Sequence, residues 1–134
     1  MGALLPYWIQ RADLSATNFA PVDVRGGLKA FEGEDWAAAL VLESTLNADG
    51  EENCPPGIGF VAPTGAILHI CPRPDGRALV HYHAQMKRKL FGLITIPRSG
   101  LYTKEDVERS SIPGIIEAFF AARHEELLGK LAAT

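Results

Sequence analysis

Two turns of the same design divide residues 57–83 into three apolar stretches. Ala62-Pro63-Thr64-Gly65 and Arg73-Pro74-Asp75-Gly76 each place proline at the second turn position and glycine at the fourth. This chemistry is typical of a type I turn that ends on a left-handed residue and reverses the chain between two strands. Residues 57–83 are therefore predicted to form a three-stranded antiparallel meander.

The turns also predict the register of the meander and the face on which each side chain lies. The expected opposite pairs are Ile58 with Ile70, Phe60 with Leu68, Gly59 with His69, and His69 with His81. Because side chains alternate along a strand, this register sorts the meander into two faces. One face is apolar and contains Ile58, Phe60, Leu68, Ile70, Val80 and Tyr82. The other face contains Gly57, Gly59, His69, Cys71, His81 and His83, together with Val61, Ile67 and Leu79.

Composition limits the class of protein. A chain of 134 residues is near the commonest domain size, so residues 1–134 are expected to form a single globular domain. Hydrophobic residues make up 47% and charged residues 22%, which is typical of a globular chain and not of a disordered one. The net charge of -3 and the pI of about 5.8 provide no overall attraction to nucleic acid or to anionic lipid, so neither is an expected partner.

Cysteine content and the N-terminal sequence favour a cytoplasmic protein. Cys54 and Cys71 are the only cysteines, too few for the disulfide framework of a small secreted domain, and both are expected to be reduced. The apolar run near the N-terminus has no basic flank and is interrupted at Pro6, unlike a signal peptide. No other apolar run is long enough to span a membrane. The sequence leaves the oligomeric state open.

The N-terminal third contains one ambiguous segment. Tyr7–Gln10 is a predicted strand, Asp13–Pro21 a predicted loop, and Asp23 the cap of a short helix that ends at Glu32. The alanines of residues 36–46 favour a helix, whereas alternating apolar residues favour a buried strand. We interpret residues 36–46 as a strand that pairs with the strand containing Ile58.

The C-terminal half is expected to continue the sheet and then cover it. Residues 85–89 are predicted to be a basic connection, residues 90–96 a strand, and Thr103–Arg109 a short helix. A helix with Pro113 in its first turn is predicted to run to about Leu131. The chain is therefore assigned to the α+β class, with an antiparallel sheet of about five strands packed against C-terminal helices.

The histidine-bearing face of the meander is one candidate site. His69 and His81, if opposed, have Cβ atoms about 5 Å apart, and His83 and Cys71 lie one step away along their strands. Imidazole and thiolate suit zinc or another transition metal, and the same histidines could act in catalysis. The sequence contains no Cys-x-x-Cys or His-x-x-x-His element to support a metal site, and structural histidines are the commoner alternative.

Gly57 and Gly59 lie on the same face as the histidines. Glycine within a strand usually marks a bulge or the close approach of another group. The surface above Gly59 could be a shallow groove with His69 and His81 as its walls. The apolar residues on this face must also be shielded from water. We expect one of the protein's own helices to supply that cover.

The preferred functional interpretation is a noncatalytic binding protein. Residues 47–56 are rich in turn formers, and their carboxylates are expected to be exposed at Asp49, Glu51 and Glu52. Exposed aromatic anchors are predicted at Trp8, Trp36 and Tyr102. A small acidic protein of this kind resembles immunity proteins and antitoxin-like inhibitors in composition, and its expected partner is a basic protein that it occludes. The alternative is a small enzyme or a metal-dependent sensor, with zinc as its cofactor, built on His69, Cys71, His81 and His83.

Overall fold

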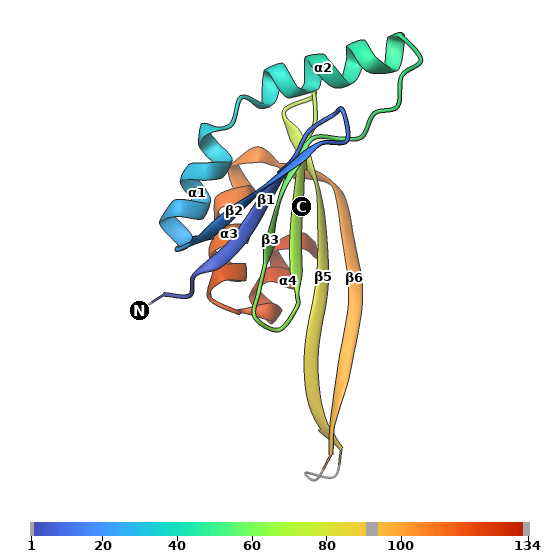
Figure 1. The fold of residues 1–134 in the computed structure, drawn as a ribbon. Helices are drawn as coiled ribbons and strands as arrows, with labels where there is room; N and C mark the ends of the chain where they lie inside the picture. Colours follow the sequence, from blue (N-terminus) through green and yellow to red (C-terminus); the bar gives the residue numbers. More distant parts are fainter. Residues whose placement is uncertain (1, 91–93, 133–134) are drawn as a thin grey trace.

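The chain forms a six-stranded antiparallel sheet. Figure 1 shows the helices packed against it. The structure is a computed structural model that describes residues 2–90 and 94–132, and the side chains of residues 2–84 and 100–132. The strands, in the spatial order β2-β1-β3-β4-β5-β6, are β1 (Leu5–Gln10), β2 (Ala16–Val22), β3 (Gly57–Val61), β4 (Ile67–Pro72), β5 (Arg77–Leu90) and β6 (Ile94–Glu108). The helices are α1 (Val24–Gly33), α2 (Trp36–Ala48), α3 (Ile112–Phe120) and α4 (His124–Ala132), with a short 3-10 helix at Arg109–Ser111. The predicted α+β class is confirmed, with six strands in place of about five.

The meander has the predicted register. Ile58 lies opposite Ile70, Gly59 opposite His69, and His69 opposite His81. The predicted core face is buried: Ile58, Phe60, Leu68, Ile70, Val80 and Tyr82 all belong to the main core cluster. Helices α1, α3 and α4 cover this face of the sheet (Figure 1). The turn chemistry therefore determined both the pairing and the buried face.

A third turn of the same design joins β1 to β2, which the sequence did not indicate. The Arg11 amide donates to the Ser15 carbonyl at 2.8 Å, and the Leu14 amide donates to the Arg11 carbonyl at 3.1 Å. The same two bonds close the turns at residues 62–66 and 73–77. In the first turn Leu14, with a φ of 75°, takes the left-handed position that glycine takes in the other two. The prediction of a loop over Asp13–Pro21 was therefore wrong, because residues 16–22 pair with β1.

The prediction of a strand at residues 36–46 was also wrong. These residues belong to helix α2, whose N-cap Asp35 accepts a hydrogen bond from the Ala38 amide at 3.0 Å. The neighbour of β3 is instead β1, in which Trp8 lies opposite Gly59. The alanine-rich start and the capping carboxylate together outweigh the short apolar alternation. The prediction that Asp23 caps a short helix is confirmed by its bond from the Gly26 amide at 2.8 Å.

The C-terminal half differs from expectation at three places. Residues 85–90 belong to β5 and are not a connection, and residues 91–93 of the strand predicted at 90–96 lie outside the described residues. Residues 103–108 continue β6 and do not form a helix, because Thr103 pairs with His81 across the β5–β6 ladder. The single helix expected up to Leu131 is divided into α3 and α4 by a left-handed residue at Ala122.

The β5–β6 hairpin extends beyond the rest of the sheet. The pairs between β4 and β5 end at Ile67 with His83, whereas the pairs between β5 and β6 continue to Leu90 with Ile94. Figure 1 shows the two strands continuing past the ends of β3 and β4 as a two-stranded arm. The basic residues of the segment 85–89 therefore lie on this arm.

Candidate functional site: an acidic end and a histidine row

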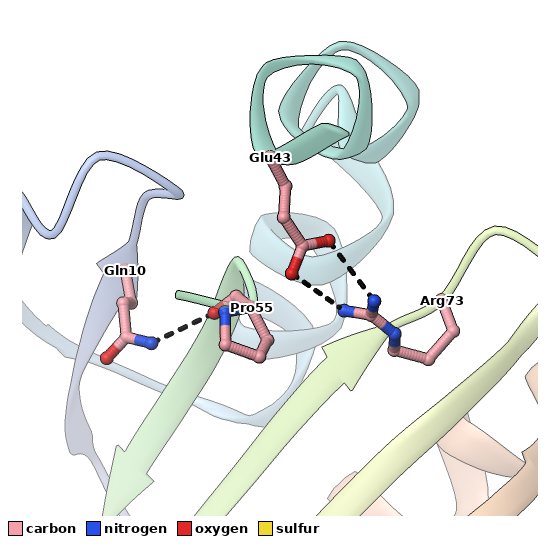
Figure 2. A network of polar contacts seen from close by, with 4 residues as sticks. All are labelled: Gln10, Glu43, Pro55 and Arg73. Carbon is pink, nitrogen blue, oxygen red and sulfur yellow. Dashed lines mark hydrogen bonds and ion pairs between the residues drawn. The ribbon is translucent and has the colours of Figure 1, made fainter. Parts of the chain in front are cut away.

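Helix α2 lies at one end of the sheet and is attached to it at few points. Trp36 is the only buried residue among the described residues of α2. Its indole N–H donates to the Phe31 carbonyl at 2.8 Å, and the two rings pack with centroids 5.9 Å apart. The second attachment is the ion pair between Glu43 and Arg73 of the β4–β5 turn, at 3.2 Å (Figure 2). The rest of α2 is left largely accessible.

The loop that follows α2 is fastened to the β1–β2 turn. The Cys54 amide donates to the Ala12 carbonyl at 3.0 Å, and the Cys54 thiol donates to the Arg11 carbonyl at 3.1 Å. The side-chain amide of Gln10 donates to the Pro55 carbonyl at 2.9 Å (Figure 2). These bonds hold residues 53–56 against the end of β1. We refer to α2 (Trp36–Ala48), the loop 49–56 and the β1–β2 turn 11–15 as the acidic end.

The predicted carboxylates are exposed at the acidic end. Asp49 caps the C-terminus of α2, and Glu51 and Glu52 follow it in the loop. Asp13 adds a fourth carboxylate in the β1–β2 turn, where it accepts hydrogen bonds from the Ser15 amide and hydroxyl. Within the described residues, none of these four carboxylates takes part in an ion pair. Their negative charge is therefore available to a partner.

Exposed apolar side chains accompany these carboxylates. Val41 and Leu42 on α2 are 64% and 39% exposed, and Leu14 in the β1–β2 turn is 53% exposed. Leu40 and Val41 also line a groove of about 710 Å³ between α2 and the β4–β5 turn. Sequence reasoning missed all of these apolar residues, although an apolar run at residues 40–42 within an exposed helix could have revealed two of them.

The predicted aromatic anchors do not lie together. Trp36 is 4% exposed and belongs to the core, so it is not on the surface. Trp8 is half-buried on the sheet face opposite the core. Tyr102 is 37% exposed beside α4, with its ring centroid 6.3 Å from that of His124. The aromatic candidates therefore lie on different elements, with Trp8 on β1, Trp36 in the core and Tyr102 on β6.

The predicted histidine face forms a stacked row across the sheet. The ring of Trp8 stacks on His69 with centroids 5.7 Å apart and planes inclined by 21°. His69 in turn stacks on His81 at 6.0 Å and 17°. The ring nitrogen Nδ1 of His81 lies 3.0 Å from the Thr103 hydroxyl on β6. The row therefore connects β1 to β6 across four strand boundaries.

The space above Gly59 is occupied by a side chain from the neighbouring strand of the sheet. A Cβ added to Gly59 would overlap the indole ring of Trp8, so the glycine provides the space that the ring occupies. A Cβ added to Gly57 would come within 2.9 Å of both the Cys71 sulfur and Nε2 of His69. The expectation that a helix covers the surface above Gly59 was wrong, because the Trp8 side chain of β1 covers it.

Burial favours the neutral forms of His69 and Cys71. Burial, and secondarily the charge of His81, lower the pKa of His69 from its ordinary value. Burial also raises the pKa of the Cys71 thiol to about 11, so the thiol keeps its proton at neutral pH. The Cys71 sulfur lies 3.7 Å from Nε2 of His69, and His83 pairs with Ile67 in the next row. In residues 2–90 and 94–132, no group of three or more His, Cys, Asp or Glu side chains is arranged to hold a metal ion.

Comparison with known proteins gives no relative to guide these assignments. No protein-family model, curated protein or solved structure matches the chain. Within the described part of the chain, no helix combines the length and the apolar character needed to cross a membrane. The functional proposal therefore depends on the geometry of the acidic end and of the histidine row.

Proposed function

We propose that this chain is a noncatalytic binding protein that docks a basic protein on its acidic end and blocks the surface that it covers. Immunity proteins and antitoxin-like inhibitors act in this way. The observation that carries the proposal is that helix α2 exposes apolar side chains and the loop directly after it exposes carboxylates, at Asp49, Glu51 and Glu52, that have no ion-pair partner among the described residues.

The two kinds of side chain have different tasks in this interface. Burial of Val41 and Leu42 against a partner removes apolar area from water and supplies most of the affinity. The carboxylates attract a basic surface over a longer distance, so they mainly raise the association rate and exclude acidic partners. Helix α2 presents the apolar side chains and the loop that follows it presents the carboxylates, so both can contact a partner without disturbing the sheet.

The proposal is tested by purifying the untagged protein from its native cell extract and identifying any co-eluting protein by intact mass. We expect a basic protein in one-to-one ratio. The double variant Glu51→Lys and Glu52→Lys is then expected to lower its association rate by about tenfold or more at low salt. The wild-type rate is expected to fall steeply as ionic strength rises.

The matched control reverses two carboxylates elsewhere. Glu117 on α3 and Glu125 on α4 are exposed, so changing both to Lys alters the net charge equally while leaving the acidic end intact. This control should bind like the wild type. An acidic partner, or equal rates for the two double variants, would overturn the proposal. Loss of binding or activity on His69→Ala, with normal behaviour of the loop variant, would favour the enzyme or sensor built on the histidine row.

A further inference from the structure

A second hollow lies where the two C-terminal helices meet the sheet. Its volume is about 520 Å³, within the range of small-molecule sites. It is bounded by the N-terminal segment, the β3–β4 turn, β5 and the α3–α4 junction. Residues from these parts that line it include Leu5, Pro63, Tyr82, Phe119, His124 and Leu127.

Short side chains keep this hollow open. Protein interiors are normally packed to a density that leaves few voids larger than a water molecule. Here much of the wall consists of alanine, at Ala3, Ala62, Ala66, Ala118 and Ala122. These methyl groups do not reach across the gap between the turn and the helices. The result is an apolar cavity beside a well-packed core.

The chain reverses direction at Ala122, which places the polar side chains of Arg123 and His124 in the wall of the cavity. Ala122 has a φ of 58°, and its amide donates to the Phe119 carbonyl at 3.1 Å while the Arg123 amide donates to the Ala118 carbonyl at 2.9 Å. This pattern ends α3 and directs the chain into α4. Arg123 and His124, which follow the reversal directly, both line the cavity.

Within the cavity wall, His124 is held by Tyr82. The Tyr82 hydroxyl and Nδ1 of His124 are 2.8 Å apart. Burial, and to a smaller degree the neighbouring Tyr102, raise the pKa of Tyr82, so the hydroxyl keeps its proton and can donate to Nδ1. When Nδ1 of His124 accepts this bond, Nε2 carries the N–H of the ring and is a donor.

The described residues that line the cavity carry positive charge but no negative charge. Among the described residues that line the cavity there is no carboxylate, whereas Arg123 contributes a guanidinium. The Arg123 side chain is 67% exposed, and its only ion pair in the described structure is to Glu126 on the outside of α4, at 3.4 Å. Its fork of donors can therefore bind a second carboxylate.

We propose that this cavity binds a small apolar monocarboxylic acid, whose hydrocarbon part enters the alanine-lined hollow and whose carboxylate is held by Arg123 and His124. The single-sign lining favours an anion over a neutral or cationic ligand. The apolar wall favours a hydrocarbon tail over a sugar or a nucleotide. This site is separate from the acidic end and does not depend on its function.

The test compares octanoate with 1-octanol by isothermal titration calorimetry on the whole chain. Octanoate is expected to bind more tightly than the alcohol of the same length. Arg123→Gln is expected to weaken octanoate binding by about three- to tenfold and to leave octanol binding unchanged, because it removes one charge-assisted interaction at an exposed position. Ala62→Leu, which adds volume at the partly buried β3–β4 turn, is expected to abolish binding of both probes.

A control and a second readout keep the test decisive. Arg25 on α1 is exposed and does not line the cavity, so Arg25→Gln makes the same charge change elsewhere and should bind octanoate like the wild type. If Ala62→Leu fails to fold, the chemical shifts of His124 and Ala118 in the wild type should still move on octanoate addition. Absence of octanoate binding, equal affinity for both probes, or equal loss in the two arginine variants would overturn the assignment.

Discussion

The indole of Trp8 occupies the space that a side chain on Gly59 would need. The two residues are directly opposite each other on β1 and β3, so the indole is folded flat over the sheet. From there it reaches across β3 to stack on His69 of β4. The glycine therefore allows a ring from one strand to contact a ring two strands away.

Gly59→Ala is expected to lower the free energy of unfolding by about 2 kcal/mol or more, because an added methyl displaces the Trp8 ring from its place on His69. In a Trp8→Ala background the same change should cost less by about 1 kcal/mol, since the obstructing ring is gone. Urea unfolding of the four proteins measures the coupling. Additive effects of the two substitutions would show that the ring does not depend on the glycine.

Leu14→Gly is expected to raise the free energy of unfolding by about 0.5–1 kcal/mol. Leu14 has a φ of 75° in the β1–β2 turn, a conformation that costs a side chain energy and glycine almost none. Gly76 has the corresponding position in the β4–β5 turn, with open space around it. Gly76→Ala should therefore destabilise by a similar amount, and thermal unfolding of both variants compares them. Destabilisation by Leu14→Gly would mean that the exposed leucine makes a contact of its own.

Ala122→Gly is expected to stabilise the chain by about 0.5–1 kcal/mol for the same reason, because Ala122 ends α3 in the left-handed conformation. Its neighbour Ala121 has a φ of -82° and gains nothing from glycine. Ala121→Gly should lower stability through the added entropy of the unfolded chain. Opposite signs in chemical unfolding are the expected result, and equal signs would contradict it.

These turns also explain how much of the fold the sequence could predict. Pro63 with Gly65 and Pro74 with Gly76 signal two turns, and alternation of apolar residues then sets the register of β3, β4 and β5. The β1–β2 turn has the same hydrogen bonds, but Leu14 stands where glycine would signal it. The sequence therefore predicts a loop where the structure has β2.

The other two mispredicted elements depend on hydrogen bonds that apolar alternation does not reveal. The Thr103 segment carries a helix-start signal, yet it pairs with β5 because the ladder of the long hairpin supplies backbone hydrogen bonds along its length. The sequence of α2 has local features typical of a helix and of a strand, and the cap at Asp35 favours the helix. Neither outcome follows from alternation alone.

The candidate sites were predicted in part. The opposition of His69 and His81 followed from the register, and the exposed carboxylates of residues 49–52 followed from turn-forming composition. The Tyr82–His124 pair could not be predicted, because it joins residues 42 positions apart through the packing of α4 on the sheet. Contacts between elements that no local pattern connects become visible only in the folded chain.

Acid is expected to destabilise the protein below about pH 6.5. The pKa of His69 is lowered in the folded chain, so the unfolded chain binds a proton that the folded chain resists. The stability from neutral His69 is complete above its unfolded pKa and falls as pH decreases toward its folded pKa, by at most about 1.4 kcal/mol per pH unit. Urea unfolding between pH 7.5 and 5 measures the slope.

His69→Gln is the control for this slope, because it keeps a polar side chain and removes the titration. The lowered pKa of Asp13 affects only the region below its ordinary value of 3.8, outside this window. A slope that persists unchanged in His69→Gln would assign the pH dependence to another group.

Val41→Ser combined with Leu42→Ser separates binding from folding at the acidic end. Both side chains are exposed on α2, so each change is expected to alter the free energy of unfolding by less than about 0.5 kcal/mol. Trp36→Ala, which empties the one buried position of the helix, should cost about 2 kcal/mol or more. If α2 is the docking surface, the double serine variant dissociates from the basic partner faster while its unfolding midpoint stays near that of the wild type. A large loss of stability in the serine variant would instead place Val41 and Leu42 in the fold, and unchanged dissociation would move the interface away from α2.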